Sequence, residues 1–415
     1  MVDVIIAGAG IGGLVTALCL HRAGFSVRIH ERVQALESIG FAVGLHPNWV
    51  KLLYELGLEH DLDEAGIRRS KALFYSRHGQ LIYEEPTGIE ASYNWPVYSM
   101  HRGNFQQLLL RHIRDEIGET SIRLSQKLVV FRSVSDHVEV DFVNPSTGGQ
   151  NTELAKVLVG ADGINSTVRK ILYPDEGRPL WSGVTIWRGV TQTDKLLLGG
   201  RTLIVMGNPN DVQLVMGHVS KNVINWTCLV RVEDSNMQIS PVTPDWNNLG
   251  HIEDLLPLIS NMKLNFVDIH HIIQSSMIIN KFPMTDRNIL PRWTHDRVTL
   301  LGDAAHPMYP YGGNGASQAI LDARGLILSF RQHGVTPQGL QAFDDLRRPA
   351  SNIVVLASRQ YSCDEILKVV HERAPDGFEH LSDVISSAEL EAIMSNSKRV
   401  AGLHAEQLNQ EPPLF

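Results

Sequence analysis

The 415-residue sequence contains only three cysteines and has no excess of basic residues. Cys19, Cys228 and Cys363 are odd in number and far apart, which argues against a disulfide framework and against clustered metal ligands. The formal net charge of −8 lacks the basic bias that nucleic-acid binding requires. We therefore expect a protein of a reducing compartment, the cytoplasm, with no nucleic-acid partner.

Long hydrophobic runs are also missing. The longest uncharged run, from Val4 to Leu20, contains four glycines and follows Asp3 rather than a basic region, so it predicts neither a signal peptide nor a membrane span. The histidines show no metal-ligand spacing, and the adjacent His270 and His271 are expected to point to opposite sides of a strand. We predict no membrane contact and no metal, and we leave open whether the chain is a monomer or a homodimer.

The hydrophobic pattern predicts an α/β fold in two main parts. Residues 2–33 read as a strand, a tight glycine turn, a helix and a second strand, which is half of a doubly wound Rossmann-like unit. Residues 46–66 and 103–117 are expected to be helical. We expect a discontinuous nucleotide-binding domain formed by residues 1–70, 101–180 and 285–360. A β-rich substrate domain, formed by residues 71–100 and 181–284, is inserted into it. Residues 361–415 are expected to form a helical C-terminal segment.

A G-x-G-x-x-G pattern lies between the first strand and the first helix. Gly8, Gly10 and Gly13 permit a tight turn, a close approach of the backbone to a pyrophosphate and tight helix packing. Glu31 ends the second strand, where a carboxylate can accept hydrogen bonds from ribose hydroxyls. The alternatives are glycines kept for steric reasons and a plain surface carboxylate. Only one such turn is present, so we expect it to hold the more tightly bound nucleotide cofactor.

Two later segments carry further signals. LVGADGINSTVRK (158–170) places Asp162 after an apolar strand and before a helix, and the alternative reading is an ordinary N-capped helix. LLGDAAHPMYPYGGNGASQAILDA (300–323) places Asp303 at a strand end, followed by a glycine loop that opens a helix. Such a loop points several backbone N–H groups at one spot and stabilises negative charge, although it is also compatible with a simple strand–turn–helix connection.

Taken together, these three segments resemble the class A FAD-dependent aromatic monooxygenases, the para-hydroxybenzoate hydroxylase fold group. The motifs occur in the family's order, and the resemblance covers nearly the whole chain. The resemblance implies FAD, NADH or NADPH as co-substrate, and O2, with transfer of oxygen from a flavin C4a-hydroperoxide to an aromatic small molecule. Residues 184–191, 245–257, 282–293 and 308–322 further resemble the phenazine-carboxylate hydroxylases, whereas the strands at 201–233 match poorly.

The resemblance also assigns cofactor residues. Asp303 would bind the ribityl chain or pyrophosphate, Arg102 would lie along the diphosphate or isoalloxazine, and Asp162 would serve both FAD and the nicotinamide nucleotide. Pro310 would fix the entry of the glycine loop. The full set implied for FAD is Gly8, Gly10, Gly13, Glu31, Arg32, Gly44, Arg102, Leu128, Asp162, Asp303, Gly313, Gly315 and Ala316.

Arg188 is the leading candidate for a substrate contact. A cation within a β-rich, largely apolar domain needs a partner, and either a substrate carboxylate or phenolate or an internal carboxylate would meet that need. Further pocket candidates, each equally compatible with plain core, are Trp187, Met206, Met216, His218 and Trp226; for His218 a satisfied sheet histidine is favoured.

The sequence leaves alternatives for the reaction. A flavoenzyme of the same fold could carry out N-oxidation or epoxidation, and a flavin-binding redox sensor would need no turnover. The complete set of FAD motifs beside a substrate domain favours a monooxygenase acting on an acidic or phenolic ring. Loss of CO2 is left open.

Overall fold

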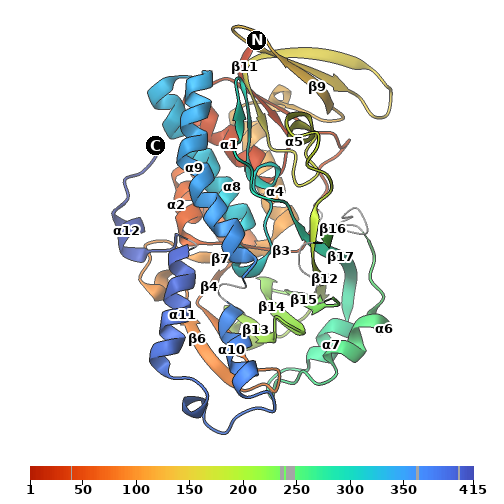
Figure 1. Ribbon diagram of the computed structural model, residues 1–415, viewed down its shortest axis with the longest axis vertical. Coiled ribbons are helices and arrows are strands. Elements are labelled where there is room, and N and C mark those ends of the chain that lie inside the picture. Colours follow the sequence, from red (N-terminus) through yellow and green to blue (C-terminus); the bar gives the residue numbers. More distant parts are fainter. Residues whose placement is uncertain (39, 234–237, 240–247, 361–363, 401) are drawn as a thin grey trace.

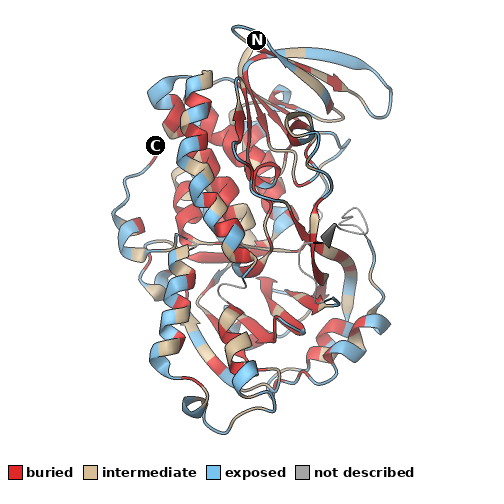
Figure 2. Ribbon diagram, viewed as in Figure 1, coloured by how far each residue is buried: buried red, intermediate tan, exposed pale blue. Residues whose placement is uncertain are grey.

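The computed structural model describes residues 1–38, 40–233, 238–239, 248–360, 364–400 and 402–415. Cys363 and part of the segment 245–257 therefore lie outside the described residues. Figure 1 shows two sheets at opposite ends of the long axis, with the longest helices beside the first sheet. Buried residues concentrate in these helices and in the strands of both sheets (Figure 2). Among the described helices, none has the length and apolar character needed to cross a bilayer.

The first sheet follows the predicted doubly wound pattern. Its order is β18-β19-β11-β1-β2-β8, with β1 parallel to both β11 and β2. The central strands are apolar because both faces are covered. The hairpin of β9 and β10 extends β11 in antiparallel fashion. The strands are β1 (Val2–Ala7), β2 (Val27–His30), β8 (Ile122–Arg123), β9 (Lys127–Ser133), β10 (Val138–Val143), β11 (Gln150–Gly160), β18 (Thr294–His295) and β19 (Val298–Leu300).

The helices around this sheet share one hydrophobic core with it. α1 contacts α4 and α8, and α8 packs along α9. The predicted helical regions 46–66 and 103–117 are confirmed as α2 with α3 and as α4. The helices are α1 (Ile11–Arg22), α2 (Pro47–Glu55), α3 (Glu59–Ala65), α4 (Arg102–Glu116), α5 (Thr167–Leu172), α8 (Gly315–His333) and α9 (Pro337–Ser358), with the 3-10 turns η5 (Gly302–Ala304) and η6 (Tyr311–Gly313) before α8.

The second sheet also has eight strands among the described residues and is mainly antiparallel. Its order is β16-β12-β15-β14-β13-β5-β6, and β17 pairs with β12. A small sheet, β3-β7-β4, accompanies it. The strands are β5 (Lys71–Tyr75), β6 (Leu81–Pro86), β12 (Leu180–Gln192), β13 (Thr202–Gly207), β14 (Val212–Ser220), β15 (Val223–Arg231), β16 (Gln238–Ile239) and β17 (Ser276–Asp286), with β3 (Ala42–Leu45), β4 (Gly66–Arg69) and β7 (Val97–His101) in the small sheet.

Helices cover both faces of the second sheet. On one face α6 (Ile252–Leu255) and α7 (Ile269–Gln274) close a core that includes Trp187 and Trp226. On the other face α10 (Glu365–Arg373) and α11 (Ser387–Val400) pack over the β5 and β13 end, and α12 (Ala405–Gln410) follows. His270 and His271 lie in α7, so the expectation that they occupy a strand is wrong: Asp268 caps a short helix by accepting from the backbone N–H of His271 at 3.0 Å.

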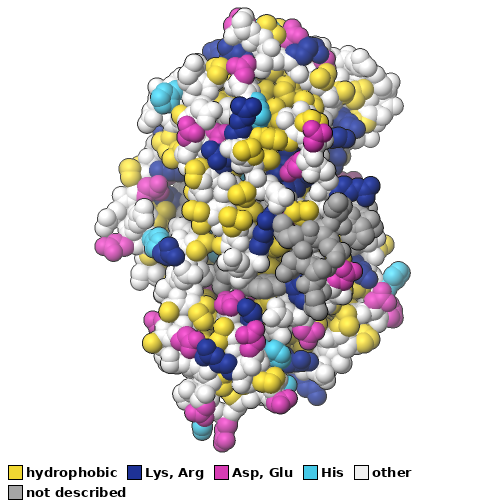
Figure 3. Space-filling view, in the orientation of Figure 1, with side chains coloured by type: hydrophobic (Ala, Val, Ile, Leu, Met, Phe, Trp, Pro, Cys, Tyr) yellow, Lys and Arg dark blue, Asp and Glu magenta, His cyan; other side chains and the backbone are white. Residues whose placement is uncertain are grey.

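The proposed domain boundaries stay a prediction, and the structure shows one pairing between segments assigned to the substrate domain. The segments 71–86 and 180–231, distant in sequence, meet because β5 pairs with β13 in parallel. On the face shown in Figure 3, positive and negative side chains of the described residues are interspersed, which does not indicate a charged binding surface there.

The packing of α10 predicts a stability difference. Ile366 is fully buried against the sheet, whereas Ile353 on α9 is 58% exposed. Ile366→Ala should therefore destabilise the protein by about 2 to 5 kcal/mol, because it removes buried methyl groups and leaves a cavity. Ile353→Ala should change stability by less than about 0.5 kcal/mol. Thermal and urea unfolding of both variants measure this, and equal losses would contradict the packing described.

Candidate active site

The glycine turn between β1 and α1 contains two kinds of glycine. A Cβ on Gly13 would lie 2.1 Å from the carbonyl oxygen of Gly8, and one on Gly8, at φ +109°, would lie 2.3 Å from that of Ala161. These two glycines are required by the packing of the protein itself. A Cβ on Gly10 would meet no protein atom within 4 Å. Gly10 therefore borders open space at the end of the sheet, where a nucleotide would fit.

Two helices begin at this region without a side-chain cap. α1 starts after Gly10 and α8 after Asn314, and neither has a capping hydrogen bond or an acidic residue in its first turn. By contrast, Thr336 caps α9 by accepting from the N–H of Gly339 at 3.1 Å. Uncapped N–H groups and the helix dipole together favour a negatively charged partner. The two helix ends thus fit the diphosphate and the electron-rich edge of a reduced flavin.

Glu31 supports the glycine turn directly. Its carboxylate accepts hydrogen bonds from Ala9 N at 2.9 Å and from Val33 N at 3.1 Å. Each carboxylate oxygen keeps further acceptor capacity for a ribose hydroxyl. The backbone N–H of Gln126 donates to Glu31 O at 2.8 Å, which brings the start of β9 and the buried Leu128 beside this residue. Arg32 follows on the exposed surface.

Asp162 caps α5. Its carboxylate accepts from the Ser166 hydroxyl and from Thr167 N at 2.6 Å, so the alternative reading of an N-capped helix describes the side chain. Burial raises the pKa of this carboxyl. The backbone beside it packs against Gly8. A cofactor contact at Asp162 is therefore proposed for the backbone rather than for the side chain.

Arg102 and Asp303 face each other across the entrance of α8. A Cβ on Gly315 would lie 4.0 Å from Asp303 Oδ1, which places this carboxylate at the helix N-terminus. Both side chains are reached by solvent, yet desolvation raises the pKa of Asp303 and lowers that of Arg102. From this combination we infer that the two groups line a recess at the start of α8. Asp303 could accept from ribityl hydroxyls there, and Arg102 offers charge to a phosphate.

A buried carboxylate that the sequence analysis did not single out fixes the position of Asp303. Asp322 on α8 is fully buried and accepts from Gly302 N at 3.1 Å and from His306 Nε2 at 2.6 Å. Its second oxygen accepts from Arg347 Nε on α9 at 2.9 Å. Desolvation opposes ionisation here, but these partners hold the pKa of Asp322 below its usual value. His306 thus has a structural partner in Asp322.

His46 joins the loop of Gly44 to the glycine loop. Its Nε2 lies 3.2 Å from Gly312 O, so Nε2 carries the proton and donates to the carbonyl. Burial, with Arg69 nearby, lowers the pKa of His46 to about 4. Pro310 starts the turn η6 by accepting from Gly313 N at 2.9 Å. A Cβ on Gly44 would meet nothing within 4 Å, and one on Gly313 would meet only His46. Sequence reasoning passed over His46 because a single histidine before a proline carries no pattern.

Arg188 lies on the face of the second sheet that carries the tyrosines of the glycine loop. Its guanidinium carbon lies 5.5 Å from the centroid of Phe282, and Phe282 packs with Tyr309 and Tyr311 in one apolar cluster. Burial, and then repulsion from Arg102, lower the pKa of Arg188 to about 10, which leaves it charged at neutral pH. Its Nε is buried without a hydrogen-bond partner. Within the described residues, the internal carboxylate that the sequence left open does not appear.

The five further pocket candidates lie on the opposite face. They belong to the core beneath α6 and α7 or line it, and each is at most 2% exposed. His218 is satisfied within this layer, because its Nε2 accepts from Leu197 N at 2.9 Å. The structure thus separates Arg188 from the residues Trp187, Met206, Met216, His218 and Trp226, and the core reading describes all five.

Asn225, which the sequence analysis did not single out, links the second sheet to β3. Its Oδ1 accepts from Ala42 N at 2.9 Å, which ties β15 to β3 and so to Gly44. Arg102 N donates to Phe41 O at 2.7 Å at the same place. The recess is therefore bounded by β3, by the Tyr309–Gly313 loop and by the Arg188 face of the second sheet.

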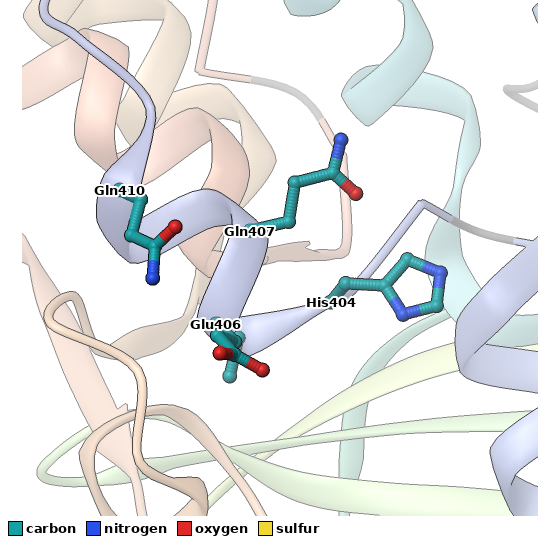
Figure 4. A pocket seen from close by; sticks show the side chains of 5 residues that line it. His404, Glu406, Gln407 and Gln410 are labelled. Atoms are coloured by element: carbon teal, nitrogen blue, oxygen red, sulfur yellow. The ribbon is translucent and has the colours of Figure 1, made fainter.

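Other hollows and clusters offer less. Figure 4 shows a shallow hollow along α12 whose labelled side chains His404, Glu406, Gln407 and Gln410 point in different directions, so no polar groups converge on a ligand. In α3, His60, Asp61 and Glu64 bring possible ligand atoms within 4.8 Å, but Asp61 already pairs with His112 at 2.6 Å.

Comparison with known proteins places this geometry in context. The model of the FAD binding domain family matches residues 1–356. The phenazine 1,6-dicarboxylic acid hydroxylase PhzS of Lysobacter antibioticus is 35% identical over 368 residues, 86% of this chain and 89% of that protein. The 6-hydroxynicotinate 3-monooxygenase of Pseudomonas fluorescens is 27% identical over 79% of this chain and 82% of its own length.

Solved structures share the fold at lower identity. CtdE in complex with FAD and substrate aligns with a TM-score of 0.76 at 20% identity and covers 97% of this chain and 99% of that one. HpxO of Klebsiella pneumoniae, complexed with FAD and uric acid, aligns with a TM-score of 0.74 at 20% identity over 99% and 97%.

The two kinds of glycine predict opposite outcomes. Gly13→Ala should destabilise the apoprotein because its Cβ would collide with the backbone of Gly8. Gly10→Ala should leave the thermal stability of the apoprotein within about 0.5 kcal/mol and weaken FAD binding, since the new methyl group enters space the cofactor would occupy. Unfolding temperature and FAD titration, measured on both variants, check this. Full FAD affinity in Gly10→Ala would refute the placement.

His46 predicts an acid-dependent loss of stability. Its folded pKa of about 4 lies below the unfolded value of about 6.5, so only the unfolded chain binds this proton between the two values. Stability contributed by neutral His46 is therefore lost as pH falls through this window. His46→Gln keeps a donor for Gly312 O without a titrating group. Unfolding curves from pH 7 to 4.5 should fall more steeply for the wild type, whereas parallel curves would exclude the effect.

Proposed function

The chain belongs to the FAD binding domain family, and from this premise we propose that it is an FAD-dependent monooxygenase that hydroxylates an aromatic acid held by Arg188. The observation that carries the acidic substrate is the charged, desolvated guanidinium of Arg188, which lacks an internal carboxylate among the described residues. A buried charge without a counter-ion is costly, and a substrate carboxylate or phenolate would remove that cost.

Cofactor binding is proposed for the residues that converge on the recess. The turn at Gly10 and the start of α1 would hold the diphosphate, Glu31 the ribose, and Asp303 the ribityl chain. The start of α8, at Gly315 and Ala316, would present N–H groups to the flavin edge. Bound FAD, once reduced by NADH or NADPH, supplies the activated oxygen from O2. The protein contributes position, charge and exclusion of water.

The wall beside Arg188 is supported by an apolar cluster. Phe282, Tyr309 and Tyr311 pack with aliphatic side chains, and each of the three is at most 4% exposed, so the cluster lies behind the recess. Such a wall would help to keep water away from the reaction. Arg188 at the edge of this wall would fix the end of the ring that carries the acid.

The names of two relatives favour carboxylated heteroaromatic substrates. PhzS is named for a phenazine dicarboxylic acid and the second relative for 6-hydroxynicotinate. We propose phenazine-1-carboxylate and related acids as the first substrates to test, with hydroxylation at a carboxylated or phenolic carbon. The test measures whether each aromatic acid stimulates the oxidation of NADH or NADPH by the yellow, FAD-loaded protein. Mass analysis of the product follows. The product mass also separates ring hydroxylation from loss of CO2, and product structure separates it from N-oxidation or epoxidation.

Replacing Arg188 tests the anchor. Arg188→Met keeps length and packing against Phe282 but removes the charge, so the KM for the acid should rise roughly 10- to 100-fold, as expected for loss of a charged hydrogen bond. FAD content should stay unchanged. Arg178→Met, which alters an exposed arginine just before β12, serves as the control and should leave KM unchanged. An unaltered KM in Arg188→Met would retire the role.

A further inference from the structure

On the face of Arg188, one strip of residues across the second sheet is only partly covered. The strand register pairs Arg188 with Thr227, and Thr227 with Val215. Residues paired in this way point to the same face of a sheet. All three are reached by solvent although they lie on central strands, whereas the neighbouring rows on both sides are buried: Ile186, Leu229 and Gln213 on one side, and Val190, Asn225 and Gly217 on the other.

The strip lies between β3 and the Tyr309–Gly313 loop, the two segments that bound the recess. On one side Asn225 binds the backbone of Ala42 in β3. On the other side Ile186 and Leu229 pack against Tyr309 and Tyr311. The strip therefore forms the floor of the recess at Arg188 and Thr227, whereas Val215 packs against the core beneath α10 and α11.

Thr227 is the second polar group of this floor. Its hydroxyl makes no hydrogen bond within the described part of the chain, and the buried Nε of Arg188 has none either. Directly opposed residues on antiparallel strands have Cβ atoms about 5 Å apart. One carboxylate could therefore accept from both side chains, with one oxygen at the guanidinium and the other at the hydroxyl.

We propose that Thr227 is a specificity-determining residue whose hydroxyl donates to the same substrate carboxylate that Arg188 binds. This inference rests on the proposed function, because it assumes an aromatic acid as substrate. It adds a second donor, which distinguishes a carboxylate with two free oxygens from a ring that carries a single phenolate oxygen.

The test uses the FAD-loaded full chain and phenazine-1-carboxylate as the probe, with Kd taken from the change in flavin absorbance. Thr227→Val keeps shape and strand preference but removes the donor, and it should raise Kd about tenfold. Thr227→Ser should stay within about twofold of the wild type. Thr185→Val, on the same sheet but the opposite face, is the matched control and should leave Kd unchanged.

A double-mutant cycle links the two donors. If both bind one carboxylate, Thr227→Val should cost less than about threefold in an Arg188→Met background, because the acid is then no longer held in place. A purely structural role for Thr227 would give the same loss in both backgrounds and no rescue by serine. Should Thr227→Val fail to load FAD, Thr227→Ala is judged by the same criteria.

The outcomes separate the two proposals. A wild type that binds none of the aromatic acids tested overturns the proposed substrate class. A wild type that binds the acid, together with a Thr227→Val variant of equal affinity, overturns the assignment of Thr227 alone.

Discussion

The buried carboxylate of Asp322 is the interaction on which the site depends. One of its oxygens accepts from Gly302 and His306, which precede the glycine loop, and the other accepts from Arg347 of α9. A carboxylate with no solvent contact is tolerable only because several donors satisfy it. Since Asp303 follows Gly302 directly and the glycine loop runs on into α8, this one side chain sets where the cofactor's charged and polar groups would meet the protein.

A second set of contacts couples the two sheets around this fixed point. His46 donates to Gly312, and Asn225 accepts from Ala42, so β3 touches both the glycine loop and the second sheet. Arg169 adds a brace, because its guanidinium donates to the carbonyls of Ala304 and Ala305 just after Asp303. The recess is therefore assembled from three elements far apart in sequence, each held by hydrogen bonds from side chains to backbone. Such contacts fix geometry with little dependence on the identity of the residues they hold.

This origin explains what the sequence could and could not predict. The strand–turn–helix of residues 2–33 was readable because hydrophobic period and glycine spacing are local signals. The faces of the second sheet were not readable, because strand alternation says which residues share a face but not what covers it. Trp187 and Met216 were thus as compatible with a pocket as with the core under α7 that they occupy. At Asp162 the local pattern offered both a cofactor contact and an N-capped helix, and the sequence alone did not choose between them.

The arginines give the recess its chemical character. Arg102 and Arg188 raise the cost of each other's charge, and Asp303 offsets only part of it, since it interacts with Arg102 and is itself desolvated. The protein alone therefore holds a surplus of positive charge, of which Arg188 is the more buried part, while Arg102 and Asp303 are exposed to solvent. The diphosphate of FAD would offset this surplus near Arg102, but Arg188 sits across the recess on another sheet. The acidic substrate proposed above would supply an anion there and would leave with the product. The charge proposed to stabilise the bound acid would then also discriminate against neutral rings.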